Sequence, residues 1–379
     1  MIKSANPKIF SWARNRLGLS IEELAHELKK EPQEIRLWES GEKGISYTTL
    51  SILAYSYFKI PIAVFFFPEP PDIENPIKKF RRLPNYEFEK LTLDTRKKML
   101  LAQSYQNSLV ELFEGNSNYD AIHRRLNPHD YTLHDLAAEI RKRLGITLQT
   151  QFKFKYQDEA FKAWRVALEK AGIFCFKDSF KDRSISGFCL IDAQFPVIMI
   201  NNSNSFTRQT FTLFHELGHI LFGVNGVTDI DESYIDHMAT SDKKIEIRCN
   251  QLASEVLVPT DSFESDVEYY RDIGFEMIPE LAHKYSVSRE VILRKLLSNN
   301  VVKKADYERL SAEWNKDYLR DRQKRTGGNP YLTKISYLGE GFSKVAFKQY
   351  RNRKIDKATL AGHLNVKARN LDNFAFYLS

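Results

Sequence analysis

One run of residues, from His215 to His219, constrains this chain more than any other feature. The two histidines are four residues apart, so on a helix their imidazoles lie on the same face, one turn from each other. Glu216 follows the first histidine, where its carboxylate can reach a water on the same metal ion. Two imidazoles and a third protein ligand are typical of a zinc ion whose fourth position is left to water. We therefore predict a helix that binds Zn²⁺ through His215 and His219, with Glu216 as general base.

The third protein ligand has to come from another part of the sequence. Asn225 occupies the position at which an extended version of this motif has a third histidine, so that version is excluded. Glu246 is the better candidate, because it lies on the next predicted helix. Asn250 follows it one turn later and could hydrogen-bond a metal ligand. The loop between the two helices holds the alternatives, which are Asp231, Asp236 and His237.

The composition is that of a globular chain with more than one domain. At 379 residues, 42% of them hydrophobic and 28% charged, two or three domains are expected. The three cysteines are widely spaced, which argues against a disulfide framework and favours the cytoplasm. We see no signal peptide, and Lys59 and Pro61 interrupt the apolar stretch 50–67. No interaction with a membrane is therefore expected.

The first 66 residues are predicted to form a compact all-α domain. The signals that separate its helices are glycines after last turns, a Ser-x-x-Glu capping box and a proline at a first turn. In chain order these signals are Gly18, Ser20 with Glu23, Pro32 and Gly41. A fourth helix is expected over residues 49–58. Five prolines then mark residues 67–85 as an extended linker.

A small sheet is expected in the middle of the chain. Pro196 suits an edge strand or the first residues of a strand. Cys175 and Cys189 fall within predicted strands, so we expect them to be small buried core residues. The predicted strands are three short apolar runs bounded by turn residues, at 173–176, 187–191 and 195–200. Helices are predicted on both sides of them, over 88–113, 133–144, 205–222 and 243–257.

Residues 19–41 resemble the Xre/Cro type of helix-turn-helix. The second helix of such a pair enters the DNA major groove. Gln33 and Arg36 would face outward, Gln33 toward an adenine edge and Arg36 toward a guanine or a phosphate. The apolar residues that would join the two helices are Leu24, Ala25, Leu28, Ile35 and Trp38.

Charge argues against DNA binding by this part of the chain. Glu31 and Glu34 stand on the same short helix as Arg36 and would repel phosphates. Residues 1–70 hold nine Lys/Arg against eight Asp/Glu, a balance of only +1. A protein-docking role for the same helices therefore stays open.

Residues 130–300 resemble the ImmA/IrrE metallopeptidases. The resemblance rests on the run from Phe211 to His219, on the run from Glu246 to Ala253, and on Val256-Leu257-Val258-Pro259. It implies a gluzincin-like zinc fold in which Glu246 is the third ligand. Members of this family are associated with cleavage of helix-turn-helix repressors or related regulators. One departure is Phe214, where the family usually has alanine; the bulkier side chain is expected to narrow the site but removes no catalytic group.

The C-terminal region is strongly basic. Residues 303–379 hold seventeen Lys/Arg against eight Asp/Glu, a balance of +9. This balance suggests an acidic partner, nucleic acid first, although a solvated basic surface is the alternative. Residues 281–292 and 360–367 both have helix-turn-helix spacing, which is also typical of helical hairpins packed in a core. The second pair is the better candidate for a DNA contact, because it lies in the basic region.

Together these features predict a mostly helical α+β chain with an all-α helix-turn-helix domain, a gluzincin-like metallopeptidase domain with a small sheet, and a helical C-terminal region. This order of domains resembles that of fused regulator-peptidases, some of which are encoded with toxins. The resemblance covers nearly the whole chain. Expected partners are DNA, a protein substrate or toxin, and a second copy of the chain as a homodimer. The predicted division is 1–66 helix-turn-helix, 67–85 linker, 86–145 helical connector, 146–300 metallopeptidase and 301–379 basic helical region.

Three functions are compatible with this organisation. The first is a regulator with a zinc endopeptidase that cleaves a regulatory protein. The second is a repressor or antitoxin whose zinc domain is structural or a sensor, without turnover. The third is a protein-binding scaffold that binds neither zinc nor DNA. For the first function a second stabiliser of the oxyanion is needed, and the candidates are Arg208, Tyr234 and His237.

Overall fold

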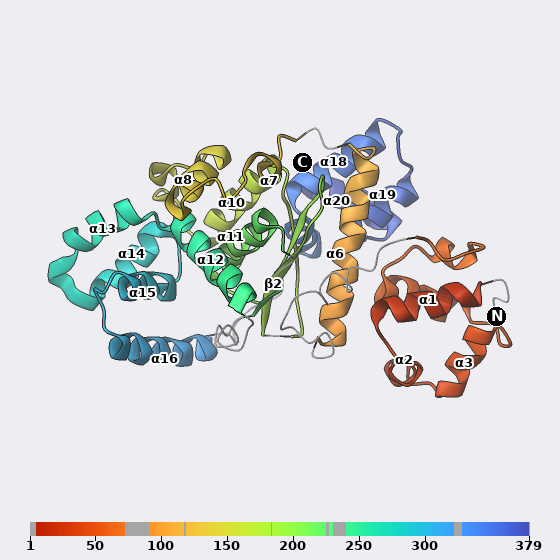
Figure 1. Ribbon diagram of the computed structural model, residues 1–379. Coiled ribbons are helices and arrows are strands. Elements are labelled where there is room, and N and C mark those ends of the chain that lie inside the picture. The colour runs from red at the N-terminus through yellow and green to blue at the C-terminus, as the bar shows by residue number, and fades with distance from the viewer. Residues whose placement is uncertain are drawn as a thin grey trace. The chain divides into compact units, whose positions relative to one another are not determined.

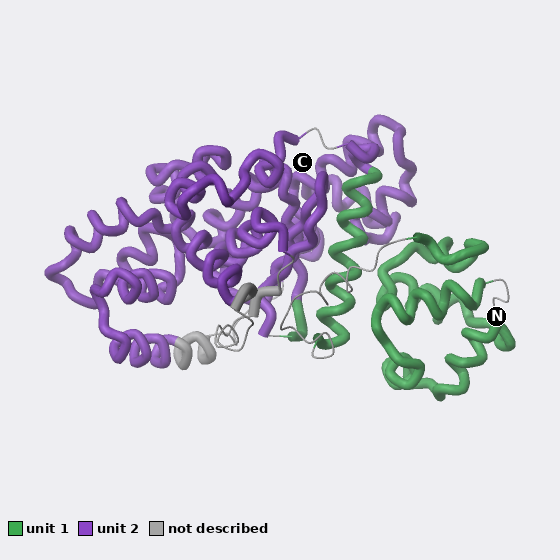
Figure 2. The backbone as a smooth tube through the Cα atoms, in the orientation of Figure 1, with its two compact units in different colours: residues 1–111, 180–182 green, residues 112–179, 183–379 purple. Residues whose placement is uncertain are grey.

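The computed structural model describes most of the chain and divides it into two compact units (Figure 2). Unit 1 contains residues 1–111 and 180–182, and unit 2 contains residues 112–179 and 183–379. The described residues are 5–72, 91–116, 119–182, 184–224, 227–229, 240–321 and 328–378. Most of the expected proline-rich linker, from residue 73 onward, lies outside the described residues.

Unit 1 begins with short helices whose boundaries follow the predicted signals. Ser20 accepts a hydrogen bond from the backbone N–H of Glu23 (3.0 Å), and the Glu23 carboxylate accepts one from the N–H of Ser20 (2.7 Å). Gly18 and Gly41 both adopt left-handed backbone conformations after the helices they end. The helices are α1 (Pro7–Leu17), α2 (Ile21–Leu28), α3 (Pro32–Ser40) and α4 (Tyr47–Ile52), with the π-helix η1 (Leu53–Phe58) and the 3-10 helix η2 (Ile62–Phe66).

The predicted fourth helix differs from the structure in its hydrogen bonding. It is α-helical only to Ile52 and continues as the π-helix η1, which ends when Lys59 turns left-handed. These wider turns bring Leu53, Ala54 and Phe58 into the core. The ring of Phe58 meets that of Phe10 edge-on at 6.0 Å.

The long helix α6 (Leu93–Leu112) also belongs to unit 1 over most of its length. Arg96 on α6 donates to the carbonyl oxygens of Leu17 (3.4 Å) and Gly18 (2.7 Å). These carbonyls lie at the end of α1 and have no partner within that helix, so Arg96 satisfies them from outside. α6 therefore packs with the N-terminal helices.

Unit 2 is built on a four-stranded sheet with the strand order β1-β3-β2-β4. β1 and β3 are parallel, and the other two pairs are antiparallel. The three predicted strands are present, but β4 was not predicted. The strands are β1 (Phe174–Asp178), β2 (Ile185–Leu190), β3 (Val197–Asn201) and β4 (Val227–Asp229).

Pro196 does not mark an edge strand. It lies immediately before β3, which runs between β1 and β2 inside the sheet. Its carbonyl oxygen accepts a hydrogen bond from the N–H of Phe174 (3.3 Å). Because Pro196 precedes the first residue of the ladder, its missing N–H does not interrupt the sheet. The edge-strand prediction was wrong, and the alternative of a strand's first residues was right.

Helices cover both faces of this sheet (Figure 1). One face presents Cys175 and Cys189, both buried as predicted, to a core shared with α8, α10, α11 and α12. The opposite face presents Phe176, whose ring meets Phe342 of α18 edge-on at 5.1 Å. The helices of this part are α7 (Ile122–Arg125), α8 (Leu133–Leu144), α9 (Leu148–Gln151), α10 (Gln157–Lys170), α11 (Phe206–Phe222) and α12 (Thr240–Leu257).

The rest of unit 2 is helical, which completes the mostly helical α+β fold expected from the sequence. Among the described helices we find none whose length and hydropathy would let it span a lipid bilayer. The remaining elements are α13 (Thr260–Tyr269), η5 (Arg271–Glu276), α14 (Met277–Tyr285), α15 (Arg289–Ser298), α16 (Lys304–Asp321), α17 (Pro330–Leu338), α18 (Glu340–Arg351), α19 (Lys357–Leu364), η7 (Ala368–Asn370) and α20 (Leu371–Leu378).

The segment around α17 lies against the edge strand β1. Arg165 on α10 donates to the carbonyl oxygen of Cys175 on β1 and to those of Ser336 and Tyr337 on α17. Its charge is paired with Glu169, one turn later on α10 (3.1 Å). One buried guanidinium thus joins the edge of the sheet to the C-terminal helices.

Candidate metal centre

The predicted zinc motif lies on α11, a helix with defined ends. Ser205 caps its first turn by accepting from the N–H of Arg208 (3.3 Å), and Gly223 ends it in a left-handed conformation. His215 and His219 are one turn apart in the buried part of this helix. Their imidazoles therefore face the neighbouring α12, which packs along α11.

Three side chains from the two helices converge. The Nε2 atoms of His215 and His219 lie 3.0 Å apart. One carboxylate oxygen of Glu246 lies 3.2 Å from Nε2 of His215, and the other lies 3.2 Å from Nε2 of His219. All three side chains are buried, and their ligand atoms lie within 4.8 Å of one another. Two imidazole nitrogens and a carboxylate are a donor set that suits zinc.

Asn250 orients the first of these imidazoles. Nδ1 of His215 donates to Oδ1 of Asn250 at 2.8 Å, one turn after Glu246 on α12. A proton fixed on Nδ1 leaves the lone pair on Nε2 directed at the shared site, where a metal ion would bind. The sequence singled out Asn250 for such a contact.

The electrostatics of the site favour a positive charge between the three side chains. Burial acts to raise the pKa of Glu246, but hydrogen bonds from His215 and His219 outweigh it and hold the pKa well below its ordinary value. Burial acts to lower the pKa of His219, but the neighbouring Cys249 and Glu246 raise this pKa well above its ordinary value. The carboxylate thus stays ionised and stabilises a cation, as metal binding requires.

The two helices can approach closely because Gly218 has no side chain. A Cβ atom at this position would lie 3.0 Å from Sγ and 3.2 Å from Cα of Cys249 on α12. An alanine here would therefore require Cys249 or the helix backbone to shift by a few tenths of an ångström. Since His215, His219 and Glu246 come from these helices, Gly218 permits the close approach that brings the three side chains together.

Glu216 is fully buried on α11. Burial raises the pKa of the Cys249 thiol, and the charges of Glu246 and Glu216 raise it further. Glu216 directly follows His215 on α11, so it lies next in the helix to one of the candidate metal ligands.

The other residues proposed for the reaction are not brought together with the three ligands in the described part of the chain. Arg208, two turns before His215 on α11, donates to the hydroxyl of Ser186 on β2 (3.0 Å). The remaining candidates for a third ligand or for an oxyanion donor lie outside the described residues: Asp231, Asp236, His237 and Tyr234.

The residues proposed for DNA contacts lie in unit 1. Gln33 and Arg36 are both exposed on α3, as expected for the outward face. Arg36 forms an ion pair with Glu22 of α2 (2.7 Å). Glu34, expected to repel phosphates, is paired with Lys30 and Lys43, both at 3.1 Å. Part of the repulsion is therefore cancelled within the domain.

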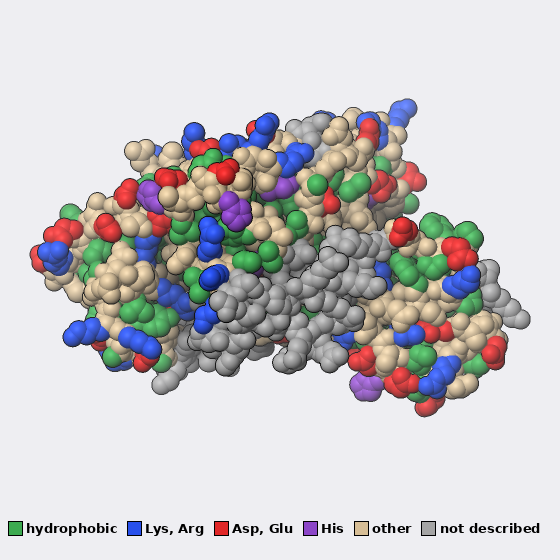
Figure 3. Space-filling model, in the orientation of Figure 1, with side chains coloured by type: hydrophobic (Ala, Val, Ile, Leu, Met, Phe, Trp, Pro, Cys, Tyr) green, Lys and Arg blue, Asp and Glu red, His purple; other side chains and the backbone are tan. Residues whose placement is uncertain are grey.

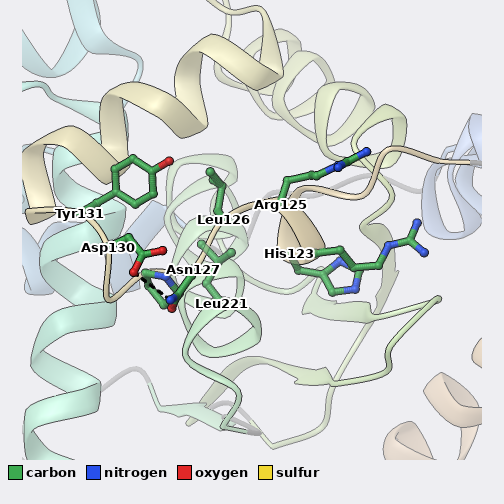
Figure 4. Close-up of a pocket in the computed structure, with 9 residues that line it drawn as sticks. His123, Arg125, Leu126, Asn127, Asp130, Tyr131 and Leu221 are labelled. Atoms are coloured by element: carbon green, nitrogen blue, oxygen red, sulfur yellow. Dashed lines mark hydrogen bonds between the residues drawn. The ribbon is translucent and has the colours of Figure 1, made fainter.

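A polar pocket of about 360 Å³ lies beside the end of α11 (Figure 4). Its cationic side chains already have partners in the protein. Arg125 is paired with Asp120 (2.5 Å), and His123 contacts the carbonyl oxygen of Ala193 (3.1 Å). None of the three converging ligands lines this pocket. The pocket is therefore distinct from the candidate metal centre.

Sequence reasoning missed the role of Cys249, which it treated only as one of three free thiols. The thiol is fully buried between α11 and α12 and lies beside His219. A signal was present in the sequence: Cys249 lies between Glu246 and Asn250 on one predicted helix, and the zinc motif on the other helix contains a glycine. Small residues on the facing sides of two helices indicate a close approach.

Comparisons with known proteins agree with this reading of the two regions. Residues 168–297 match the IrrE N-terminal-like domain family, and residues 11–61 match a helix-turn-helix family. The chain therefore joins an Xre-like helix-turn-helix to a metallopeptidase domain of the ImmA/IrrE type.

A particular relative is the radiation response metalloprotease IrrE of Deinococcus radiodurans. It is 33% identical over 113 residues, which make up 29% of this chain and 34% of the relative. The match thus covers about a third of the relative's length.

Proposed function

We propose that this protein is a DNA-binding regulator with a zinc-dependent endopeptidase domain that cleaves a regulatory protein. The observation that carries the proposal is the convergence of His215, His219 and Glu246 in one buried cluster. The likeness to a protein named as a metalloprotease supports it. So does the helix-turn-helix family match in the same chain, because it links the domain to gene regulation.

His215, His219 and Glu246 would hold the zinc ion, with Asn250 fixing the orientation of His215. A bound zinc ion supplies Lewis-acid chemistry, which makes water a better nucleophile and a carbonyl carbon a better electrophile near neutral pH. Glu216 takes the proton from the attacking water and passes it to the nitrogen of the broken peptide bond. Burial among apolar side chains keeps bulk water from competing for that proton.

DNA binding is assigned to α3 in this proposal. Gln33 and Arg36 are exposed on this helix, and both side-chain types can form paired hydrogen bonds with base edges in the major groove. The ion pair between Arg36 and Glu22 is exposed, so it stabilises the fold by no more than about 1 kcal/mol. Arg36 can therefore exchange this partner for a base or a phosphate.

The test is the substitution Glu216→Gln, which removes the general base and keeps the size of the side chain. We expect zinc content to stay unchanged and peptide cleavage to be lost, because none of the three metal ligands is altered. Zinc is measured by plasma mass spectrometry. Cleavage is measured as new N-termini in a library of peptides from helix-turn-helix regulators. The matched control is Glu264→Gln, an exposed carboxylate on α13; full cleavage by Glu216→Gln would exclude this mechanism.

The second candidate function is a repressor or antitoxin with a structural or sensing zinc domain. The complete burial of His215, Glu216 and His219 favours it, because a peptide bond has to reach Glu216 to be cleaved. In this case the wild-type chain binds zinc and DNA but cuts no peptide in the library. Repression by the Glu216→Gln variant would then equal that of the wild type.

A further inference from the structure

Among the described residues, three α-helices end in the same kind of turn. In each case the α-helix ends in a left-handed residue that is not glycine, and the next N–H donates back to an alanine carbonyl of that helix. The left-handed residues are Lys29 (φ 54°), Ser286 (φ 55°) and Asn365 (φ 50°). The hydrogen bonds run from Lys30 to Ala25 (2.9 Å), from Val287 to Ala282 (3.0 Å) and from Val366 to Ala361 (3.0 Å).

We name the surrounding helices by their place in the chain. The N-terminal motif is α1 to α3, residues 7–40, which includes most of the helix-turn-helix family match. The lobe motif is α14 and α15, residues 277–298. The tail motif is α18 to α20, residues 340–378, which lie together in Figure 1. Neither family match reaches the tail motif.

The tail motif and the N-terminal motif also share a core. The ring of Phe10 on α1 meets Trp38 of α3 at 5.7 Å, and the ring of Phe347 on α18 meets Phe374 of α20 at 5.9 Å. Trp38 lies as many residues after Ala25 as Phe374 lies after Ala361. Each motif therefore packs its first helix against its last around one aromatic pair, as three-helix DNA-binding domains do.

The lobe motif cannot present its second helix to a partner. α15 is covered by α16: Glu290 accepts from the hydroxyls of Tyr307 (2.6 Å) and Ser311 (3.0 Å). Lys295 on the same helix is buried and paired with Glu255 (2.8 Å). This pair is a helical hairpin within the core. The turn alone therefore does not make a binding surface.

The tail motif leaves the start of its last helix exposed, while α17 contacts the later part of that helix. Arg369 in η7 and Asp372 in α20 are exposed, and Leu371 and Phe374 are buried inside. Further along α20, Asn373 donates to the hydroxyl of Tyr331 on α17 (3.0 Å), and the ring of Tyr377 stacks on that of Tyr331.

Asp372 is the one acidic residue of η7 and α20, and Lys357 lies 3.5 Å from it. This contact places the start of α19 beside the exposed side of α20. In the N-terminal motif, the ion pair between Glu22 and Arg36 joins the start of α2 to α3 in the same way. The charges are reversed, because the cation is on the earlier helix in the tail motif and on the later helix in the N-terminal motif.

The charge of the two motifs differs. The N-terminal motif holds six Lys/Arg and six Asp/Glu. On the face that Figure 3 shows, side chains of both charges are interspersed in this part of the chain. The tail motif holds eight Lys/Arg against three Asp/Glu. Among the described residues, five cations of the tail motif are exposed and take part in no ion pair: Lys348, Arg351, Arg353, Lys367 and Arg369.

From these observations we infer that the tail motif is a second binding site for duplex DNA. Arg369, in η7 immediately before α20, reaches a base edge in the major groove, and Lys367 and Arg353 bind the flanking phosphates. The shape favours DNA over RNA, because the B-form major groove admits a helix, whereas that of A-form RNA is too narrow. The inference depends neither on the metal centre nor on DNA binding by the N-terminal motif.

The experiment uses the full chain with its N-terminal motif disabled by Gln33→Glu and Arg36→Glu. The probe is a fluorescein-labelled 30-base-pair duplex of random sequence, and binding is measured by anisotropy from low to moderate salt. Into this background we introduce Lys367→Glu with Arg369→Glu, or Arg351→Glu with Arg353→Glu. The matched control is Lys303→Glu with Lys304→Glu, which changes the charge equally on exposed residues of the same basic region outside the tail motif.

We expect the N-terminally disabled chain to bind the duplex. Lys367→Glu with Arg369→Glu should weaken this binding about tenfold or more and reduce the salt dependence by about one to two ions, and the control pair should change it little. The melting temperature shows whether the Lys367→Glu, Arg369→Glu variant is folded. If it is not, the variant with Arg351→Glu and Arg353→Glu tests the same motif. The inference is overturned if the disabled chain binds no duplex, if both tail pairs act no more strongly than the control pair, or if an RNA hairpin of equal length binds more tightly.

Discussion

The metal centre and the N-terminal motif use pairs of short helices in opposite ways. In the candidate metal centre the proposed ligands on α11 and α12 point at each other and are buried. In the N-terminal motif the side chains between α2 and α3 hold the helices together, and the residues of α3 that we propose to contact DNA are exposed. A pair of packed helices thus encloses a buried site in one region and holds an exposed helix in place in the other.

The difference has a consequence for how each region responds to substitution. In the buried pair, helix spacing and chemistry cannot be separated, because Gly218 permits the close approach to Cys249 that brings the ligands together. In the exposed pair, the residues that would contact DNA have few constraints from packing. We therefore expect single substitutions in the candidate metal centre to abolish or strongly weaken zinc binding. Substitutions in the N-terminal motif should change stability or DNA binding by small amounts.

The largest effect is expected for Glu246→Ala. It removes a metal ligand from a cluster of three, so bound zinc should fall from about one equivalent to near zero, because two imidazoles alone do not make a stable protein zinc site. Zinc is measured in the purified protein by plasma mass spectrometry, with Glu264→Ala as a matched loss of an exposed carboxylate. Zinc retained by Glu246→Ala would show that another ligand, for example in the 229–237 loop, completes the site.

A smaller effect is expected for Asn250→Ala. His215 then loses the acceptor that fixes its Nδ1 proton, while the three ligands remain. The affinity for zinc should fall about 10- to 100-fold. A competitive zinc chelator measures this change, and Gln251→Ala, the exposed neighbour on α12, is the control. Equal affinities in both variants would mean that packing alone orients the imidazole.

The smallest effect is expected for Ser20→Ala in the N-terminal motif. It removes the hydroxyl that accepts from the N–H of Glu23, so the free energy of unfolding of this unit should fall by about 1 kcal/mol. Urea titration followed by the fluorescence of Trp12 and Trp38 measures it, with Ser51→Ala in α4 as control. Zinc content should not change. A loss of zinc in Ser20→Ala would contradict the separation of the two regions.

Local spacing explains why much of the site could be predicted. The interval between His215 and His219 and the interval between Glu246 and Asn250 each place two side chains on one side of a helix. The capping box at Ser20 could be predicted equally well, because all its atoms lie within four residues of the sequence. These features depend on helix geometry alone.

Features that depend on packing between distant segments could not be predicted in the same way. The position of β3 inside the sheet follows from its pairing with β1 and β2, which a single proline at its start does not reveal. The strand β4 has three residues, too few to show an alternating pattern. The difference between the lobe motif and the tail motif is likewise absent from their similar turns, because it depends on whether α16 covers the second helix.

The contact of Arg165 with β1 and α17 bears on the solubility of shortened chains. β1 is the last strand on its side of the sheet, and exposed edge strands pair readily with other chains and aggregate. Arg165 donates a hydrogen bond to the Cys175 carbonyl at this edge. The carbonyls of Ser336 and Tyr337 accept further hydrogen bonds from the same guanidinium and hold it in place. A chain cut to the matched residues 168–297 loses both Arg165 and α17 and leaves this edge open. The C-terminal helices therefore cover this edge of the sheet, and we expect a chain shortened to these residues to aggregate more readily than the full chain.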